Sequence, residues 1–187
     1  MKRLILPLMV LVSCNPYDQY LNTHYYIQAE VVPDSAWLSA NVQIVFVAGQ
    51  EYRDSICFDL NPGVEIHSLA AQELEHYRFG EYQSGRLVLY IEDPVHPNDD
   101  LNISLSYSGR LSPGGISRLD SNLMWFPVNN DTRPFTYHAK VALPGKWGIS
   151  HPRTSRGEHG KWLLQSLEPQ QSFDISLTPL GSNSRIP

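Results

Sequence analysis

The stretch Leu101-Asn102-Ile103-Ser104-Leu105-Ser106-Tyr107 decides the fold of this chain. Apolar residues occupy every second position, and asparagine or serine stands between them. Because successive side chains of a β-strand point to opposite faces of the sheet, this alternation is typical of a strand with one buried and one solvent-facing side. The stretch therefore predicts a half-buried β-strand.

The same two-residue period recurs along most of the chain. Residues 37–47 form a second example, and Pro33-Asp34-Ser35 is expected to join them to residues 24–32 as a hairpin. Within residues 37–47 one face carries Leu38, Ala40, Val42, Ile44 and Phe46. Further strands are expected at residues 53–60, 64–70, 86–92, 135–143, 162–167 and 173–177.

Helical periodicity is nearly absent. Only residues 70–75, Ala-Ala-Gln-Glu-Leu-Glu, favour a helical turn or two. Turn-forming residues recur about every 8 to 12 positions, a spacing typical of sandwiches. The sequence thus predicts an all-β fold, mainly an antiparallel β-sandwich.

The first fourteen residues have the order of a secretory signal. Met1-Lys2-Arg3 is basic, residues 4–12 are apolar except for Pro7, and Leu11-Val12-Ser13-Cys14 resembles the lipobox of bacterial lipoproteins. The apolar run spans roughly 14 Å as a helix, too short for a hydrocarbon core of about 30 Å. We therefore expect a cleaved signal peptide and a lipid anchor, diacylglyceryl with a palmitate-type acyl chain, on Cys14. The alternatives are an ordinary cleaved signal in which Cys14 is incidental, and a buried N-terminal strand.

These features divide the chain into four parts. Residues 1–13 are expected to be the lipoprotein signal peptide, residues 14–22 a short tether, residues 23–180 the β-sandwich domain and residues 181–187 a disordered tail. The membrane is thus the expected first partner, and the cell envelope the expected location. Asn15 after the lipidated cysteine favours the periplasmic face of the outer membrane over the inner membrane.

The charge of the chain restricts its other partners. The net charge is −5, and removal of Lys2 and Arg3 with the signal makes the mature chain more acidic. An acidic chain is a poor match for nucleic acid. We therefore expect an envelope protein, and no nucleic acid, as the further partner.

Catalytic motifs are missing from the sequence. It contains no His-Glu-x-x-His, no Gly-x-Ser-x-Gly and no cysteine pair with zinc spacing. Nothing in the pattern indicates that His24, His138 and His151 converge on a metal, and Cys57 in an apolar stretch is expected to be a buried small hydrophobe. The oxygen-rich residues 92–100 match no calcium loop and favour a solvated turn. We expect no metal, no cofactor and no enzymatic activity.

One basic, aromatic-bearing loop stands out on this acidic chain. It covers residues 146–161 and is the candidate binding loop, with the cations able to meet an anionic glycan, a phosphate or an acidic protein surface. A long polar hairpin loop without a ligand is the alternative. The candidate residues are Lys146, Trp147, His151, Arg153, Arg156, His159 and Lys161.

Two segments resemble a known family. Leu123-Met124-Trp125-Phe126-Pro127, followed by residues 134–150 with a Pro-Gly turn and the short strand at Ile149-Ser150, resembles the N-terminal saddle-like β domain of the gluzincin, aminopeptidase N-like metallopeptidases. Tyr107-Ser108-Gly109-Arg110-Leu111 is similar to a strand end of that domain. The resemblance covers roughly residues 23–177, and departs at His151-Pro152, where the family usually has glycine.

The resemblance implies a fold and a role, but no catalytic residue. The zinc helix and the Gly-x-Met-Glu-Asn strand of the family belong to a second domain, which we expect this chain to lack. We therefore expect a membrane-anchored, non-catalytic binding module. The alternatives are the accessory half of a split zinc peptidase, and a carrier of an apolar ligand in a pocket lined by Trp37, Trp125, Trp147 and Trp162.

Overall fold

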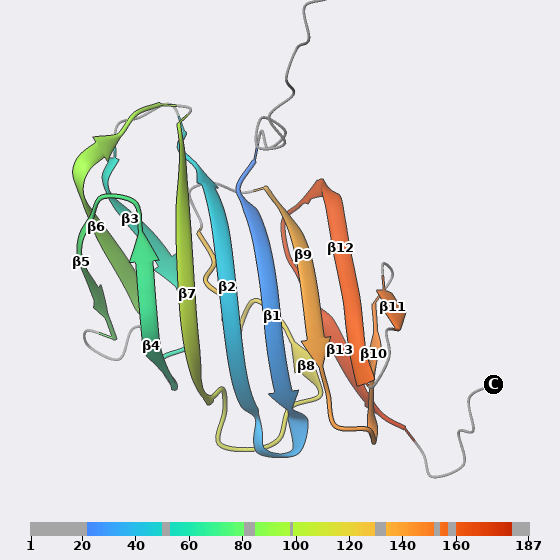
Figure 1. Ribbon diagram of the computed structural model, residues 1–187. Helices are drawn as coiled ribbons and strands as arrows, with labels where there is room; N and C mark the ends of the chain where they lie inside the picture. Colours follow the sequence, from blue (N-terminus) through green and yellow to red (C-terminus); the bar gives the residue numbers. More distant parts are fainter. Residues whose placement is uncertain are drawn as a thin grey trace, which may run out of the picture.

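The computed structural model describes residues 22–49, 53–80, 85–97, 99–129, 134–151, 154–156 and 160–180, with only the backbone for residues 154–156. The expected signal peptide, Cys14, all but the last residue of the tether, and the C-terminal tail lie outside these ranges. The described part consists of three β-sheets (Figure 1). In this part, no helix has the length and apolar character needed to cross a bilayer.

The largest sheet has seven strands in the order β11-β12-β9-β1-β2-β7-β4. Neighbouring strands are antiparallel, except that β1 runs parallel to β9. The strands are β1 (His24–Val32), β2 (Trp37–Val47), β4 (Val64–Ala71), β7 (Asp100–Arg110), β9 (Phe135–Ala142), β11 (Thr154–Arg156) and β12 (Lys161–Gln170).

The predicted hairpin between the first two strands is confirmed. The 3-10 helix η1 (Pro33–Ser35) joins β1 to β2, and Ala36 after it adopts a left-handed conformation with φ of 52°. Its backbone N–H donates to the Pro33 carbonyl and closes the turn. Proline at the first position favours such a turn because its φ is already set.

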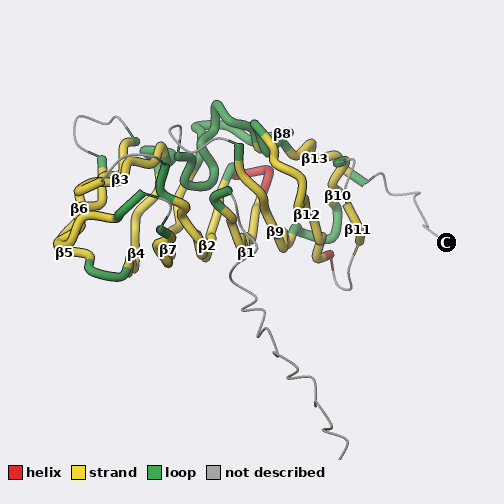
Figure 2. The backbone as a smooth tube through the Cα atoms, turned by 90° about the horizontal axis from the view of Figure 1, so that it is seen from above, coloured by secondary structure: helices red, strands yellow, loops and turns green. Residues whose placement is uncertain are grey.

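Two three-stranded sheets cover one face of the large sheet (Figure 2). One contains β10 (Trp147–Ser150), β13 (Ile175–Pro179) and β8 (Arg118–Leu119). The other contains β3 (Arg53–Asp59), β6 (Arg86–Val95) and β5 (Leu74–Phe79). The all-β, mainly antiparallel sandwich expected from the sequence is therefore confirmed.

The core lies between the large sheet and the two small ones. The alternating residues predicted to share one face of β2 and of β7 are all buried there. Each fully buried aliphatic or aromatic side chain contributes about 1.5–3 kcal/mol, so this inner face supplies most of the stabilisation. The inner aromatic cluster, in ring-to-ring contact, consists of Tyr25, Trp125, Phe126, Phe135, Tyr137 and Phe173.

The segment between β8 and β9 leads from a small sheet to the large one, passes beside β3 of the other small sheet and is held by buried polar side chains. The Asn61 amide donates to the Leu123 carbonyl at 2.8 Å and to the Leu111 carbonyl at 3.1 Å. The hydroxyl of Tyr107 donates to the Trp125 carbonyl at 2.9 Å, and Val128 pairs with Asp59 of β3. These bonds satisfy backbone carbonyls that have no partner in a regular ladder.

The expected helical turn at residues 70–75 is wrong. Strand β4 continues through Ala71, a turn follows at Gln72 and Glu73, and β5 begins at Leu74. Glu73 has a φ of 55°, which reverses the chain there. The residues have helix propensity, but pairing of β4 with β7 and of β5 with β6 supplies more hydrogen bonds than an isolated helical turn.

Candidate functional site

The predicted binding loop begins at an ion pair. The Lys146 ammonium lies 2.6 Å from the Asp34 carboxylate of η1. This hydrogen bond from Lys146 holds the pKa of Asp34 below its usual value. Lys146 therefore links the start of β10 to the β1–β2 turn while its side chain stays exposed.

Two aromatic residues of the loop point to the core. Trp147 is half-buried and packs against the hydrophobic cluster. The His151 ring lies edge-on to Phe173 at 5.8 Å, and its Nε2 is 3.3 Å from the Tyr137 hydroxyl. These two side chains help to close one end of the sandwich.

The remaining members of the loop are distributed differently. Arg153 and His159 lie outside the described residues, and Arg156 is described only as part of the backbone of β11. Lys161 is exposed at the start of β12. The loop as a binding surface thus stays a prediction, with Lys146 and Lys161 as the exposed cations among its described side chains.

The structure separates the three histidines considered for a metal. His24 and His138 flank Tyr26, with ring centroids 4.4 and 6.5 Å from it. His151 instead lies against the inner aromatic cluster, across the large sheet. Among the described residues no group of three or more His, Cys, Asp or Glu side chains is placed to hold a metal ion. Cys57 on β3 is half-buried, not fully buried as expected, because the outer face of its small sheet is open to solvent.

The four tryptophans occupy different parts of the sandwich and form no common pocket lining among the described hollows. Trp125 is fully buried at the centre of the core, Trp147 and Trp162 pack at its margin, and Trp37 is 46% exposed on the large sheet. None of them lines the hollows described below. The expected tryptophan-lined apolar pocket therefore gains no support from their positions.

The most distinctive surface is the face of the large sheet opposite the small sheets. In the described part of the chain no element covers it (Figure 2). We call it the open face and define it by the outward side chains of β4, β7, β2, β1, β9 and β12. At its centre, on β1, β2 and β7, the side chains are mostly uncharged and polar: Gln28, Ser39, Asn41, Gln43, Asn102, Ser104, Ser106 and Ser108.

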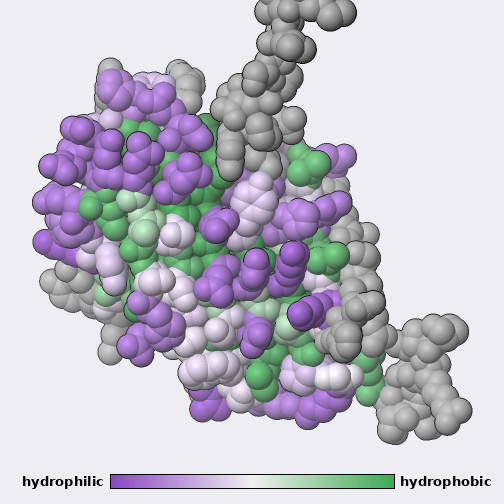
Figure 3. Space-filling model, viewed as in Figure 1, coloured by the Kyte–Doolittle hydropathy of each residue, from purple (hydrophilic) through white to green (hydrophobic). Residues whose placement is uncertain are grey.

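Three adjoining hollows mark the open face. They have volumes of about 310, 350 and 290 Å³, and the first shares Tyr26, Gln43 and Ser104 with the second. The first and third share Gln28 and Asn41. The short serine side chains of β7 stand beside the longer amides of β2, so the surface is lower over β7. In Figure 3 this face shows green apolar floor between pale and purple side chains.

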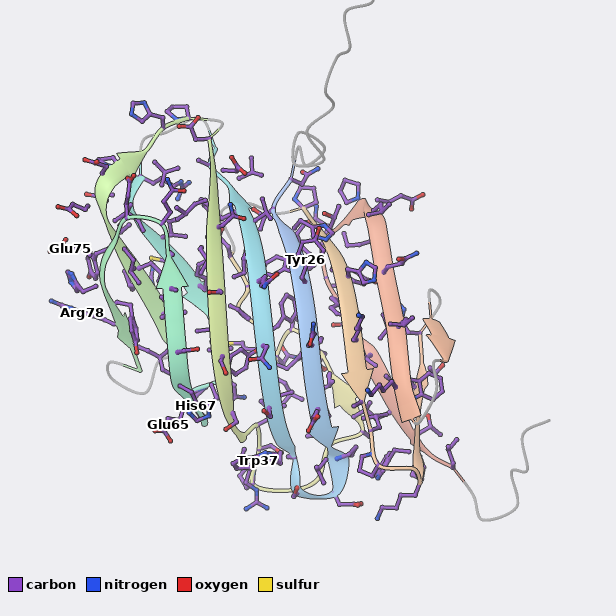
Figure 4. All side chains as sticks on the ribbon, viewed as in Figure 1. Tyr26, Trp37, Glu65, His67, Glu75 and Arg78 are labelled. Atoms are coloured by element: carbon purple, nitrogen blue, oxygen red, sulfur yellow. The ribbon has the colours of Figure 1, made fainter. Side chains whose placement is uncertain are left out.

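Aromatic side chains stand toward opposite ends of the open face (Figure 4). Tyr26 on β1 is 38% exposed, and Trp37 begins β2. Tyr26 pairs with Gln43, which is six residues from Trp37 on β2, so the two aromatics are about 20 Å apart along the strands. Figure 4 also labels Glu65 and His67 at the β4 edge, where His67 Nε2 lies 2.7 Å from the Ser108 hydroxyl.

The electrostatics of this face are set by the histidines His24 and His138 and by the charged side chains of the face. Burial, and then the neighbouring His138, lower the pKa of His24 to about 4, so its imidazole is neutral at pH 7. Its Nδ1 lies 2.6 Å from the Thr136 hydroxyl. Glu30 on β1 lies beside Ser39 and lines the third hollow together with Lys140 and Lys161. Further charged side chains, Glu65 and Arg110, lie on β4 and at the end of β7.

Comparison with solved structures identifies the fold. The M1 zinc metallopeptidase from Deinococcus radiodurans matches with a TM-score of 0.60 at 16% sequence identity, over 84% of this chain and 43% of that chain. A mutant of it bound to a Tyr-Ser-Ala substrate matches with a TM-score of 0.59 at 16% identity, over 83% and 43% of the two chains. This chain has the β fold of a part of those peptidases.

The other comparisons limit what this likeness means. The sequence matches no family model, and the search of curated proteins gave no match. A further structure, of a two-domain M1 zinc metallopeptidase mutant bound to L-arginine, gives the same coverage to within a percentage point. The chain spans less than half the length of the peptidases that it resembles. The aminopeptidase N-like fold implied by the sequence is supported, and the likeness concerns the fold alone.

Sequence reasoning did not identify the open face as a site. The signal was present in the alternation of residues 101–107, whose polar positions are Asn and Ser and never charged. The matching amides on β1 and β2 could not be placed beside them without knowing the strand order.

Proposed function

We propose that this chain is a non-catalytic binding module held in the cell envelope by a lipid on Cys14. The observation that carries the proposal is the structural match, in which most of this chain corresponds to less than half of an M1 zinc metallopeptidase. A β module of that kind packs beside other parts of a larger protein.

Anchoring is tested by substitution of the cysteine. Cys14→Ala should move the full chain from the membrane pellet to the soluble envelope fraction, because several acyl chains at about 0.8 kcal/mol per buried CH₂ are lost. Palmitate labelling should disappear with it. Cys57→Ala, the other cysteine, is the matched control and should stay labelled and membrane-bound. Unlabelled wild-type protein would contradict the lipid anchor, and density-gradient separation of the membranes would show which one holds the protein.

We propose that the partner is an envelope protein bound at the β11 end of the large sheet. Among the described residues, β11 pairs with β12 and stands at the edge of the large sheet, and such an edge can accept a strand from a partner. The basic residues of the predicted binding loop, residues 146–161, lie in the same part of the sequence and suit an acidic protein surface.

A charge-neutralising variant tests this surface. Arg153→Gln, Arg156→Gln and Lys161→Gln combined should weaken crosslinking to the envelope partner and leave the urea midpoint unchanged. The matched control combines Arg78→Gln, Arg86→Gln and Arg118→Gln, three exposed cations on the small sheets. Equal capture by both triple variants and the wild type would reject the loop as the binding surface.

A split zinc peptidase is the second candidate, favoured by the same structural match. In that case the captured partner carries the His-Glu-x-x-His helix, and mixing the two chains raises its peptidase activity. A partner without the motif would reject this version and leave the binding module in place.

A further inference from the structure

We propose that the open face binds a neutral glycan chain of the cell envelope. The inference rests on the proposed function for the envelope location only. It assigns a ligand class to the centre of the open face on β1, β2 and β7, which contains no residue of the predicted binding loop, although Lys161 of that loop lies at the margin of the same face.

The composition of the open face suits sugar hydroxyls. A carboxamide presents a donor and an acceptor side by side, and a serine hydroxyl is both donor and acceptor. A sugar hydroxyl has the same double character, so each can pair without leaving a charge desolvated. The centre of the open face carries three amides on β1 and β2, Gln28, Asn41 and Gln43, and three serines on β7, Ser104, Ser106 and Ser108.

The register aligns these groups in rows. Gln28 on β1 lies beside Asn41 on β2, and Asn41 lies beside Ser106 on β7. Lys140 on β9 and Ser68 on β4 end this row, so it crosses five strands and about 19 Å. The next row contains Tyr26, Gln43 and Ser104. A glycan that runs along the strands crosses these rows one after the other and meets hydrogen-bonding groups in each of them.

The exposed aromatics give the face its platforms. The CH face of a pyranose ring is apolar and packs on an aromatic ring, and Tyr26 and Trp37 offer such rings at 38% and 46% exposure. The Tyr26 ring is held in place by stacking on His138 at 6.5 Å and 22°. Two platforms about 20 Å apart, with amides and hydroxyls between them, fit an extended chain of several sugars.

The charge of the face discriminates against other ligands. Binding of nucleic acid or anionic lipid requires several Lys or Arg side chains at the contact. Of the cations on the described part of the open face, Lys140 and Lys161 lie on β9 and β12 and Arg110 lies at the end of β7, while the outward positions of β1 and β2 carry no cation. Glu30 and Glu65 stand among these cations and oppose an anionic ligand. The exposed aliphatic side chains of this face, Val32, Leu163 and Leu167, lie at the end of β1 and on β12, so the polar centre lacks the apolar core that a stable protein interface buries.

Calorimetric titration of the full lipidated chain, in a detergent without a sugar headgroup, tests the proposal. The probes are chitohexaose, cellohexaose and maltohexaose as neutral glycans, a heparin hexasaccharide as an anionic one, and a neutral extended peptide. We expect at least one neutral hexasaccharide to bind with a Kd below about 1 mM. The Asn41→Ala/Gln43→Ala variant and Tyr26→Ala should each weaken that binding about tenfold.

Matched controls separate the site from general effects. Tyr77→Ala removes a tyrosine of similar exposure, 41%, from β5, and Gln171→Ala removes an exposed amide after β12. Both should bind as the wild type does. All these side chains are solvent-facing. We therefore expect the free energy of unfolding of each variant, measured with urea, to lie within about 0.5 kcal/mol of the wild-type value.

The outcomes are decisive in both directions. No neutral hexasaccharide bound by the wild type, or equal binding by the open-face variants, overturns the proposal. Preference for the heparin hexasaccharide or for the peptide overturns it as well. None of these results alters capture of a protein partner through the predicted binding loop, so the two proposals fail independently.

Discussion

At the scale of the residue, His24 shows how a polar side chain is accommodated in this sheet. It begins β1, is buried, and lies between the Thr136 hydroxyl and the Tyr26 ring. Burial disfavours the charged imidazolium more than the neutral ring. The histidine is therefore held in its neutral form by its surroundings.

The pH dependence of stability follows from this shift. The pKa of His24 is about 4 in the fold and about 6.5 when unfolded. Between these values the unfolded chain binds more protons, so the free energy of unfolding falls as the pH drops from about 6.5 to about 4. Above pH 6.5 the contribution is fully present. Urea unfolding at several pH values should show this slope, and His24→Gln should show a smaller one.

The control for this prediction is His76→Gln, which removes an exposed histidine of β5. It should retain the wild-type slope. A slope that is the same in His24→Gln as in the wild type would assign the acid sensitivity to other groups, and would contradict the role given to burial of this ring.

At the scale of the element, the contact of β7 with β4 depends on one glycine. A Cβ built on Gly109 would lie 2.2 Å from the Gly63 carbonyl oxygen and 2.5 Å from the Val64 Cα. Both neighbours are backbone atoms, so neither can move aside as a flexible side chain would. The two strands approach this closely because position 109 has no side chain.

Gly109→Ala should therefore destabilise the fold. We expect a loss of about 1–3 kcal/mol, the usual cost of overpacking, measured by urea unfolding. Gly114→Ala is the matched control, because a Cβ there meets nothing within 4 Å and should leave stability nearly unchanged. Equal stability of the two variants would show that β4 moves away from β7 without cost.

The elements that sequence reasoning missed have a common cause. Strand β5 (Leu74–Phe79) is exposed along its middle, and β8 (Arg118–Leu119) has only two residues. Neither contains an alternation long enough to recognise. Strand β5 forms because it pairs with β6, and β8 forms because it pairs with β13. A short, solvated segment that is held by such pairing has no recognisable hydrophobic pattern in its sequence.

At the scale of the whole molecule, two asparagines join the layers. The Asn129 amide donates to the Cys57 carbonyl of β3 at 2.9 Å. Asn61 bonds two carbonyls, and its own side-chain oxygen accepts from the Gly63 N–H at 2.8 Å. Buried polar groups of this kind stabilise a fold only while every partner is satisfied.

Asn61→Ala should be among the more damaging polar substitutions. It removes three hydrogen bonds and leaves the Leu111 and Leu123 carbonyls without this partner, for an expected loss of about 2–4 kcal/mol. Urea unfolding checks the value. Asn122→Ala, at an exposed position of the same connection, should change stability by less than about 0.5 kcal/mol. A loss for Asn61→Ala as small as that of Asn122→Ala would mean that water replaces the amide.

The candidate sites could be predicted from sequence only in part. The binding loop was recognisable because Lys146, Arg153, Arg156 and Lys161 cluster along the chain. Its aromatic members, Trp147 and His151, pack inward. No pattern in the sequence distinguishes an inward-packed aromatic side chain of a loop from an exposed one. The open face draws its amides and serines from β1, β2 and β7, which lie far apart in sequence.

The sequence by itself determined most of the strands and, where the alternation is long, which side of the strand is buried. The alternation in residues 37–47 and 101–107 predicted the buried faces of β2 and β7, since burial at positions i and i+2 is a local property. Only the tertiary structure decided the strand order. It placed β9 parallel to β1, with His24 beside Thr136 at a separation of 112 residues. Backbone hydrogen bonds are the same for every residue type, so strand neighbours are selected by the packing of the whole core, and the open face exists only once that selection is made.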